Sequence, residues 1–265
     1  MNSKPKTAVI TGASSGIGEA LARELSQQGW SVGLIARRID RLNQLALEIR
    51  ETGGRVEIAA ADVSDREQIT SAMESLRCSL GDIELLIANA GVGRPDYLRP
   101  FTVDDIELMF QVNTLGVVYA INSVLPQMLK NKSGHIAAVS SSGAYKGMPG
   151  SAGYCASKSA VNTFLEGLRI QLRDENISVT TICPGFVRTP MTDVNTFKMP
   201  WLVEPADAAQ RIINALKRQK KVYNFPWQMA VLVKLFRWLP DWAVAKFVPR
   251  KSDADRSVFH ENEER

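Results

Sequence analysis

Two groups of residues have the types and spacing to do chemistry. The first is the run Thr11-Gly12-Ala13-Ser14-Ser15-Gly16-Ile17-Gly18, which follows a short apolar segment and precedes a helical pattern. Glycines let the backbone turn sharply and approach a pyrophosphate, and a helix N-terminus attracts the negative charge. The two serines can add hydroxyl donors. An ordinary strand-to-helix turn is the alternative, but the position after the first predicted strand favours phosphate binding.

The second group suits proton transfer. Tyr154 and Lys158 are four residues apart at a predicted helix start, so they share one face. A phenol with a pKa near ~10 is a poor base, and a nearby ammonium lowers that pKa. Ser141 follows a predicted strand and can bind a substrate oxygen, while Asn113 lies within a long helical pattern and suggests a hydrogen-bonding task. Taken alone, the spacing of Tyr154 and Lys158 favours an ordinary surface pair, which is common on helices.

The end of the second predicted strand bears on the choice of cofactor. Dinucleotide sites often place an acidic residue there to bind the ribose 2′-OH. This chain has Arg37 and Arg38 instead, and arginine clamps a 2′-phosphate. One of the two is expected to be a solvated loop residue, and Arg37 is the better candidate for binding. Asp62 and Val63 follow the third predicted strand and fit the adenine edge, although Asp62 fits a turn equally well.

Apolar strands alternate with helical patterns along the chain. Strands are predicted at 7–10, 31–36, 55–60, 83–88, 134–140 and 177–183, and helices at 17–28, 41–51, 67–80, 103–129, 154–175 and 206–217. This alternation predicts a single α/β domain over residues 1–265, a doubly wound parallel sheet with helices on both faces.

Composition and charge limit the kinds of partner and compartment that are expected. The chain has 265 residues, 45% of them hydrophobic and 23% charged, as in ordinary globular proteins, and its net charge is +4. Nine basic residues and one acid lie between 217 and 251, but no nucleic-acid motif accompanies them, so no nucleic-acid partner is expected. Three cysteines without C-x-x-C spacing indicate no metal site and fit a reducing compartment. The N-terminus lacks a signal-peptide pattern, so a cytoplasmic location is expected.

In order along the chain, these motifs resemble the short-chain dehydrogenase/reductase family over residues 5–190. The matching segments are the glycine run 11–18, Asp62-Val63, Ala88-Asn89-Ala90-Gly91, Asn113, Ser140-Ser141, Tyr154-x-Ala156-Ser157-Lys158 and Pro184-Gly185-x-Val187-x-Thr189. The resemblance implies a Rossmann-like fold and hydride transfer between NADP(H) and a carbonyl or secondary alcohol. A non-catalytic NADP-binding or membrane-surface adaptor on the same fold is the alternative.

The resemblance also implies roles for individual residues. Tyr154 is the implied general acid/base, Lys158 lowers its pKa and holds the nicotinamide ribose, and Asn113 relays protons. Ser141 orients the substrate, with Ser140 and Ser142 as neighbours that could take its place. The implied cofactor contacts are Gly12, Ser14, Ser15, Gly16, Ile17, Gly18, Arg37, Arg38, Asp62, Val63, Asn89, Ala90, Gly91, Tyr154, Lys158, Pro184, Gly185, Val187 and Thr189.

The last quarter of the chain departs from the family pattern. Residues 191–203 are apolar and follow the cofactor motif, which suggests a loop over a lipophilic substrate. Residues 222–265 form an extension in place of the Gly-Gly ending of many tetrameric members, and Pro240 should divide its apolar part into two helices. We expect its tryptophans to be buried against the protein's own core or a sister subunit, in a homo-dimer or tetramer. The alternative is peripheral membrane contact through 226–248, because tryptophans with Lys and Arg suit a helix that lies in the membrane interface. No apolar run there is long enough to span a bilayer.

Overall fold

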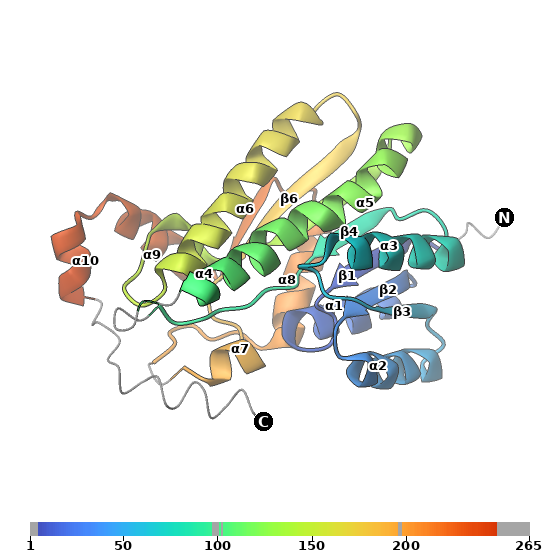
Figure 1. Ribbon diagram of the computed structural model, residues 1–265, viewed down its shortest axis with the longest axis horizontal. Helices are drawn as coiled ribbons and strands as arrows, with labels where there is room; N and C mark the ends of the chain where they lie inside the picture. The colour runs from blue at the N-terminus through green and yellow to red at the C-terminus, as the bar shows by residue number, and fades with distance from the viewer. Residues whose placement is uncertain (1–4, 97–100, 102, 196–197, 248–265) are drawn as a thin grey trace.

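The computed structural model describes residues 5–96, 101, 103–195 and 198–247. Within them, seven parallel strands form one sheet in the order β3-β2-β1-β4-β5-β6-β7 (Figure 1). The strands are β1 Thr7–Thr11, β2 Ser31–Ala36, β3 Val56–Ala60, β4 Leu85–Ala88, β5 Gly134–Val139, β6 Ile177–Pro184 and β7 Val222–Phe225. The predicted doubly wound α/β fold is confirmed, and the strand order reverses between β1 and β4.

Helices cover both faces of this sheet. Their bounds are α1 Gly16–Gln27, α2 Ile39–Glu51, α3 Arg66–Leu80, α4 Val103–Phe110, α5 Gly116–Asn131, α6 Ala152–Gln171, α7 Pro190–Asp193, α8 Pro205–Lys217, α9 Trp227–Trp238 and α10 Asp241–Phe247. One apolar cluster joins α1, α2 and α8 to one face of the sheet, and a second joins α3, α5 and α6 to the other. Every residue of β1, β2 and β4 is buried, which explains why these strands read as uninterrupted apolar runs.

The predicted helix over 103–129 is interrupted. A π-helical turn, Gln111–Leu115, separates α4 from α5 and contains Asn113. At the start of α5 the backbone lies so close to the loop after β3 that a Cβ added to Gly116 would be 3.0 Å from Val63 Cγ2. The whole stretch Val103–Asn131 is long and apolar enough to cross a membrane, but it packs on α3 and α6 as a core helix does.

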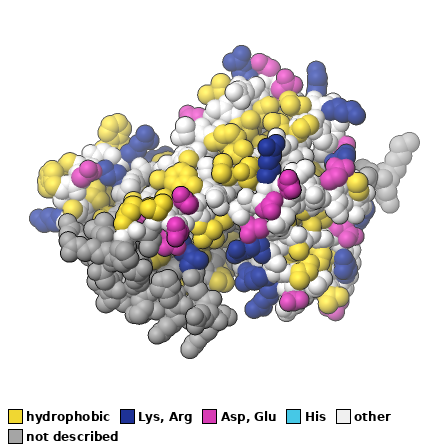
Figure 2. Space-filling model, in the orientation of Figure 1, with side chains coloured by type: hydrophobic (Ala, Val, Ile, Leu, Met, Phe, Trp, Pro, Cys, Tyr) yellow, Lys and Arg dark blue, Asp and Glu magenta, His cyan; other side chains and the backbone are white. Residues whose placement is uncertain are grey.

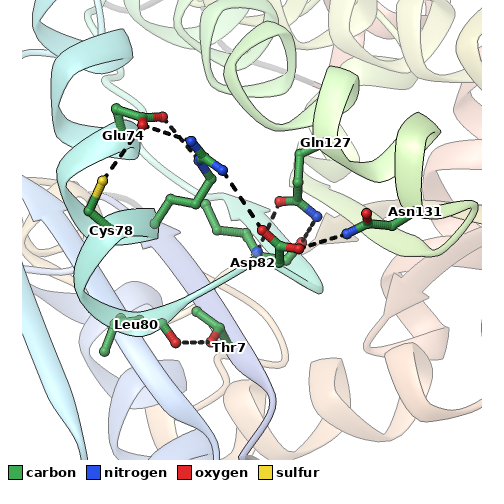
Figure 3. Close-up of polar contacts among 9 residues, drawn as sticks. Thr7, Glu74, Cys78, Leu80, Asp82, Gln127 and Asn131 are labelled. Carbon is green, nitrogen blue, oxygen red and sulfur yellow. Dashed lines mark hydrogen bonds and ion pairs between the residues drawn. The ribbon is translucent and has the colours of Figure 1, made fainter.

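A polar network at the amino ends of the strands fixes the scaffold (Figure 3). Arg77 bonds Glu74 within α3 at 2.7 Å, and Asn131 at the end of α5 donates to Asp82 at 2.9 Å. Gln127 accepts from the Ile83 backbone N–H at 3.0 Å. These bonds tie the turn between α3 and β4 to α5. The open cleft described below lies at the other end of the strands, where they reach their carboxyl ends.

The described helices of the C-terminal extension, α9 and α10, lie at the end of the molecule that Figure 1 shows at left. Two helices, α9 and α10, flank Pro240 as predicted. The expectation that the tryptophans are buried in the protein's own core is wrong, because Trp227, Trp238 and Trp242 are 70%, 86% and 74% exposed. Packing is supplied instead by Met229 and Val233 on the opposite side of α9. Burial against a sister subunit stays a prediction.

The strand that precedes α9 is an addition to the predicted elements. Its four residues, Val222–Phe225, pair in parallel with the end of β6. Such a short segment lacks a clear period, and its strand character comes from the buried Phe225 and the neighbouring edge of β6.

Candidate active site

A cleft of about 460 Å³ opens at the carboxyl ends of the strands, beside the point where the strand order reverses. Every predicted site residue lines it except Gly18 and Asn113, which lie behind its wall. The lining residues that the sequence predicted are Gly12, Ser14, Ser15, Gly16, Ile17, Arg37, Arg38, Asp62, Val63, Asn89, Ala90, Gly91, Ser141, Tyr154, Lys158, Pro184, Gly185, Val187 and Thr189.

The glycine turn between β1 and α1 has no room for side chains. Gly12 has a positive φ of 67°, and a Cβ there would lie 2.7 Å from the Ala90 Cα. A Cβ on Gly18 would collide with the Gly12 carbonyl oxygen, so Gly18 supports the turn from beneath. The Asn89 side chain donates to the carbonyls of Thr11 and Gly12 at 3.1 and 3.2 Å. The turn is therefore joined to the end of β4.

The loop after β6 closes the other side of the turn. A Cβ on Gly16, where φ is 58°, would lie 2.7 Å from the Thr189 Cγ2. Thr189 is the N-cap of α7, and its backbone N–H donates to Thr192 Oγ1 at 2.9 Å. Bare backbone thus faces the cleft at the N-terminus of α1, which fits the charge and size of a dinucleotide pyrophosphate.

The two arginines after β2 have different partners. Arg38 reaches over the glycine turn, and its Nη2 donates to Ser14 Oγ and Ser15 Oγ, each at 2.9 Å. Arg37 instead forms an ion pair with Asp62 at 3.6 Å. The sequence favoured Arg37 as the phosphate ligand, whereas the structure places Arg38 beside the serines. Both guanidinium groups line the cleft.

Asp62 acts as a turn residue, one of the two readings that the sequence left open. Its Oδ1 accepts from the Ser64 backbone N–H at 2.9 Å and from the Ser64 hydroxyl at 2.7 Å. Partial burial opposes its ionisation, but these bonds and the Arg37 charge outweigh burial and hold the pKa of Asp62 below its ordinary value. The carboxylate is therefore charged at neutral pH and neutralises part of the Arg37 charge.

Tyr154 faces the cleft from the first turn of α6, where it meets Ser141. Burial raises the pKa of the Tyr154 phenol, and a hydrogen bond with Ser141 opposes that shift. The Ser141 Oγ also accepts from the Gly143 backbone N–H at 3.0 Å, which fixes its position at the start of a 3₁₀ turn. Ser141, and not Ser140, is thus the serine beside the phenol.

Lys158 is held away from solvent one helical turn further along α6. It is 3% exposed, and its Nζ donates to the Val139 carbonyl at 2.9 Å. Burial lowers its pKa to about 8. The sequence predicted that the ammonium would lower the pKa of Tyr154. In the structure burial acts on both groups, raising the pKa of the phenol and lowering that of the ammonium. The lowering of the Tyr154 pKa by Lys158 stays a prediction.

Asn113 stands behind the cleft with its side-chain amide fully engaged. Its Oδ1 accepts from the Val92 N–H at 2.8 Å, and its Nδ2 donates to the Val92 carbonyl and to Ser157 Oγ. Ser157 in turn donates to the Tyr154 carbonyl at 2.9 Å. Gly91 packs tightly against both side chains, because a Cβ there would lie 3.1 Å from Asn113 Oδ1 and 3.2 Å from Lys158 Nζ. The amide therefore joins the loop after β4 to α6.

Sequence reasoning missed the role of Ser157 and part of the cleft wall. Ser157 lies between Tyr154 and Lys158, but its link to Asn113 spans 44 residues and leaves no local signal. From the expected substrate loop, Met191, Thr192 and Val194 line the cleft, whereas Trp201 is 46% exposed and Phe197 lies outside the described residues. The other additions to the wall are Ala36, Ala61, Val92, Gly93, Arg94, Val112, Val139, Ser140 and Pro190.

Known proteins share this sequence and architecture. Residues 6–199 match the model of the short chain dehydrogenase family. An uncharacterized oxidoreductase from Myxococcus xanthus is 36% identical over 89% of this chain and 93% of its own length. A Burkholderia phymatum short chain dehydrogenase/reductase in complex with NAD superposes with a TM-score of 0.82, at 25% identity over 88% of this chain and 92% of the other.

A third relative carries the phosphorylated cofactor. It is the Thermococcus sibiricus alcohol dehydrogenase complexed with 5-hydroxy-NADP, with a TM-score of 0.75 and 30% identity over 83% of this chain and 94% of the other. The family match covers most of the sequence, and the cleft has the shape and donors for a dinucleotide. The chain belongs to the short chain dehydrogenases, a family of NAD(P)-binding oxidoreductases.

Proposed function

We propose that this protein transfers a hydride between NADP(H) and a carbonyl or secondary alcohol carbon, with Tyr154 exchanging the proton. The observation that carries the proposal is the half-buried Tyr154, whose phenol meets Ser141 inside the cleft beside the glycine turn. When bound, the nicotinamide supplies or accepts the hydride. The chain's own residues hold the substrate oxygen and manage its proton.

Tyr154 is suited to act as the acid in carbonyl reduction. Because burial raises its pKa, the phenol keeps its proton at neutral pH and can donate it to an oxygen that gains negative charge. Ser141, held by Gly143, supplies a second hydroxyl to the same oxygen and fixes its position. For alcohol oxidation the same phenol receives the proton.

Lys158 is placed to hold the ribose next to the reacting carbon. Its Nζ lies close to Gly91, where a Cβ would be 3.2 Å away, and one of its donors is already used by Val139. Two donors remain for ribose hydroxyls. Asn113 and Ser157 act through position, because they fix the Val92 loop and the first turn of α6.

NADP(H) is the preferred cofactor in this proposal. Arg38 lies on the hydroxyls of Ser14 and Ser15, where a 2′-phosphate would gain charge-assisted bonds. One such bond is worth about 1.5–3 kcal/mol, or roughly ten- to a hundredfold in affinity. Arg37 contributes less, because Asp62 already binds it.

The substrate is proposed to be lipophilic. The wall next to Tyr154 includes Met191 and Gly93, and a Cβ on Gly93 would lie 3.6 Å from Met191 Sδ and 3.7 Å from Tyr154 Cδ2. Val194 adds apolar surface from the segment after α7. Apolar contact on this side favours a substrate with a hydrocarbon portion beside its carbonyl.

A homo-oligomer is proposed through the face formed by α5 and α6. Figure 2 shows apolar side chains gathered over these helices. On α6, Phe164 and Ile170 are 37% and 59% exposed, and Leu115, just before α5, is 41% exposed. An apolar patch of this kind on a folded surface marks a protein contact.

The test is turnover with purified full-length protein. A panel of aliphatic and aromatic ketones is incubated with NADPH or with NADH, and alcohol formation is measured together with cofactor consumption. We expect alcohol to form with the lipophilic ketones, and faster with NADPH. Tight NADPH binding without turnover of any ketone, and without oxidation of the matching alcohols by NADP⁺, would instead support the non-catalytic adaptor.

A further inference from the structure

We propose that α9 and α10 form a docking surface for an anionic lipid bilayer. The two sides of α9 are both apolar, which a helix that only completes a core does not need. Met229 and Val233 are buried against the protein. Trp227, Val231, Leu235 and Trp238 recur at helical spacing and face away from it, between 49% and 86% exposed. The outward side thus has no partner within the described chain.

The residue types on this surface are those that suit a membrane interface. Tryptophan combines a large apolar ring with an N–H donor, so it resides well at the level of the lipid headgroups. Trp227 and Trp238 lie near the two ends of α9, and Trp242 adds a third ring on α10, 74% exposed. Helices of twelve and seven residues are too short to cross a bilayer, so the surface lies on the membrane.

Charge selects the kind of lipid. Seven basic residues and one acid lie between positions 217 and 247, and that acid, Asp241, is paired with Lys146 at 3.1 Å. A groove of about 410 Å³ is formed by residues of α8, β7 and α9, and Arg211, Lys220, Lys234 and Trp227 line it together. Cations grouped beside an aromatic ring suit the phosphate of an anionic headgroup above its acyl chain.

The same charge disfavours a second copy of the chain on this surface. A two-fold interface brings identical patches face to face, so the excess cations would repel each other. The α5–α6 face, with Phe164 and Ile170 exposed, offers apolar contact away from this basic segment. An anionic bilayer satisfies both the tryptophans and the charge.

The proposed docking surface is firmly attached to the cleft. Lys146, one residue after the 3₁₀ turn that follows Ser141, donates to the Leu239 carbonyl at 3.2 Å and to Asp241. On the inner side of α9, a Cβ on Gly185 would lie 3.0 Å from Met229 Cγ. Because Gly185 lines the cleft, docking through α9 would fix how the cleft is oriented toward the bilayer.

The experiment measures vesicle binding by the full-length protein. Co-sedimentation is compared between vesicles of phosphatidylcholine alone and vesicles that also contain phosphatidylglycerol, at low and high salt. We expect at least about tenfold stronger partition onto the anionic vesicles, weakened by salt, because each cation near the surface contributes about a fivefold factor. Binding that is equal on both vesicles, or absent, would overturn the proposal.

Two variants and their controls locate the surface. Trp227→Ala, Trp238→Ala and Trp242→Ala combined should reduce partition at least about tenfold, and Lys234→Glu with Arg237→Glu should do the same. The controls are Leu47→Ala with Val103→Ala, whose side chains are 59% and 52% exposed elsewhere, and Arg66→Glu with Arg173→Glu. Controls that lose as much binding as the variants would contradict the assignment.

A second readout keeps the test independent of folding and of association. Wild-type tryptophan emission should shift to the blue on anionic vesicles, and the triple variant, which retains Trp30 and Trp201, should show no shift. Unchanged NADPH binding by the variants would show that the cleft is intact. If the triple variant halves the sedimenting mass of the free protein and binds vesicles as the wild type does, a sister subunit is the occupant.

Discussion

The cofactor cleft and the C-terminal extension use apolar and glycine-rich sequence in opposite ways. In the cleft, backbone meets backbone so closely that a single Cβ at Gly12 or Gly18 would collide with it. In the extension, α9 turns two tryptophans and two aliphatic residues outward from a side that nothing in the described chain covers. The residues of the cleft are packed against one another, whereas the outward side of α9 is the surface proposed to dock on a bilayer.

The charged groups of the two regions differ in the same way. Lys158 in the cleft is buried, bonded to Val139, and has its pKa lowered to about 8. Lys234 in the extension is exposed. A buried cation whose proton is easily lost serves chemistry at one position, while exposed cations add up to a field that acts on a large partner. Substitutions in the cleft and in the extension should therefore impair different properties of the protein.

The largest effect on cofactor binding is expected at Gly18. Gly18→Ala would press a methyl group onto the Gly12 carbonyl and displace the turn. We expect NADPH affinity to fall at least about a hundredfold, as strain of about 3 kcal/mol implies. Calorimetric titration measures it. The matched control is Gly167→Ala in α6, where nothing lies within 4 Å and stability should rise by up to about 1 kcal/mol. Equal NADPH affinity in the two variants would show that the turn tolerates a side chain.

Two aromatic residues, one on each side of Pro226, test the burial contrast directly. Phe225 is 2% exposed, and Phe225→Ala should lower the free energy of unfolding by about 3–5 kcal/mol. Trp238 is 86% exposed, and Trp238→Ala should change it by less than about 0.5 kcal/mol. Urea unfolding of both variants gives the comparison. A comparable loss in Trp238→Ala would mean that this ring is buried in solution.

Within the cleft, the two arginines are expected to differ. Arg38→Ala should weaken NADPH binding about tenfold and leave NADH binding unchanged, because Arg38 is the one that lies on Ser14 and Ser15. Arg37→Ala should have a smaller effect, since its charge is shared with Asp62. Titration of both cofactors measures the ratio. A larger loss of NADPH affinity in Arg37→Ala would restore the preference that the sequence suggested.

A pH dependence of stability is expected from the buried Lys158. The pKa of Lys158 is lowered from 10.5 to about 8 in the folded protein, so between these values the unfolded chain binds a proton that the folded chain does not. Stability conferred at this position therefore rises as pH increases from about 8 to 10.5, and the cost of burial is greatest below about 8. The stability gain of Lys158→Met over wild type should shrink across that window in urea titrations. A constant gain would show that the pKa of Lys158 is not lowered.

The sequence specified the fold well because its signals were local. Strands buried on both faces, such as β2, read as unbroken apolar runs, and glycines at fixed spacing marked the turn that needs them. Tyr154 and Ser141, which the sequence predicts as site residues, are brought together in the cleft by the same topology. The small differences between predicted and observed strand bounds do not affect the predicted fold or the placement of these residues.

What the sequence could not decide depended on partners far along the chain. Arg37 and Arg38 are adjacent, and only the fold shows that Asp62 takes the first and the serines the second. The bond between Asn113 and Ser157 crosses 44 residues. The apolar pattern of α9 allows either side of the helix to face the protein, so the sequence alone favours burial of the large tryptophans. In the structure Met229 packs against the protein, and the tryptophans face the other way.

The most direct test of the proposed function is the loss of one oxygen atom. Tyr154→Phe keeps the ring and removes the hydroxyl beside Ser141. Tyr145→Phe is the matched control, because its hydroxyl bonds Cys183 and it lies outside the cleft lining. With a ketone found by the panel, we expect Tyr154→Phe to lose turnover at least about a hundredfold while NADPH affinity is kept, and Tyr145→Phe to remain active. Wild-type turnover in Tyr154→Phe would contradict the role assigned to this phenol.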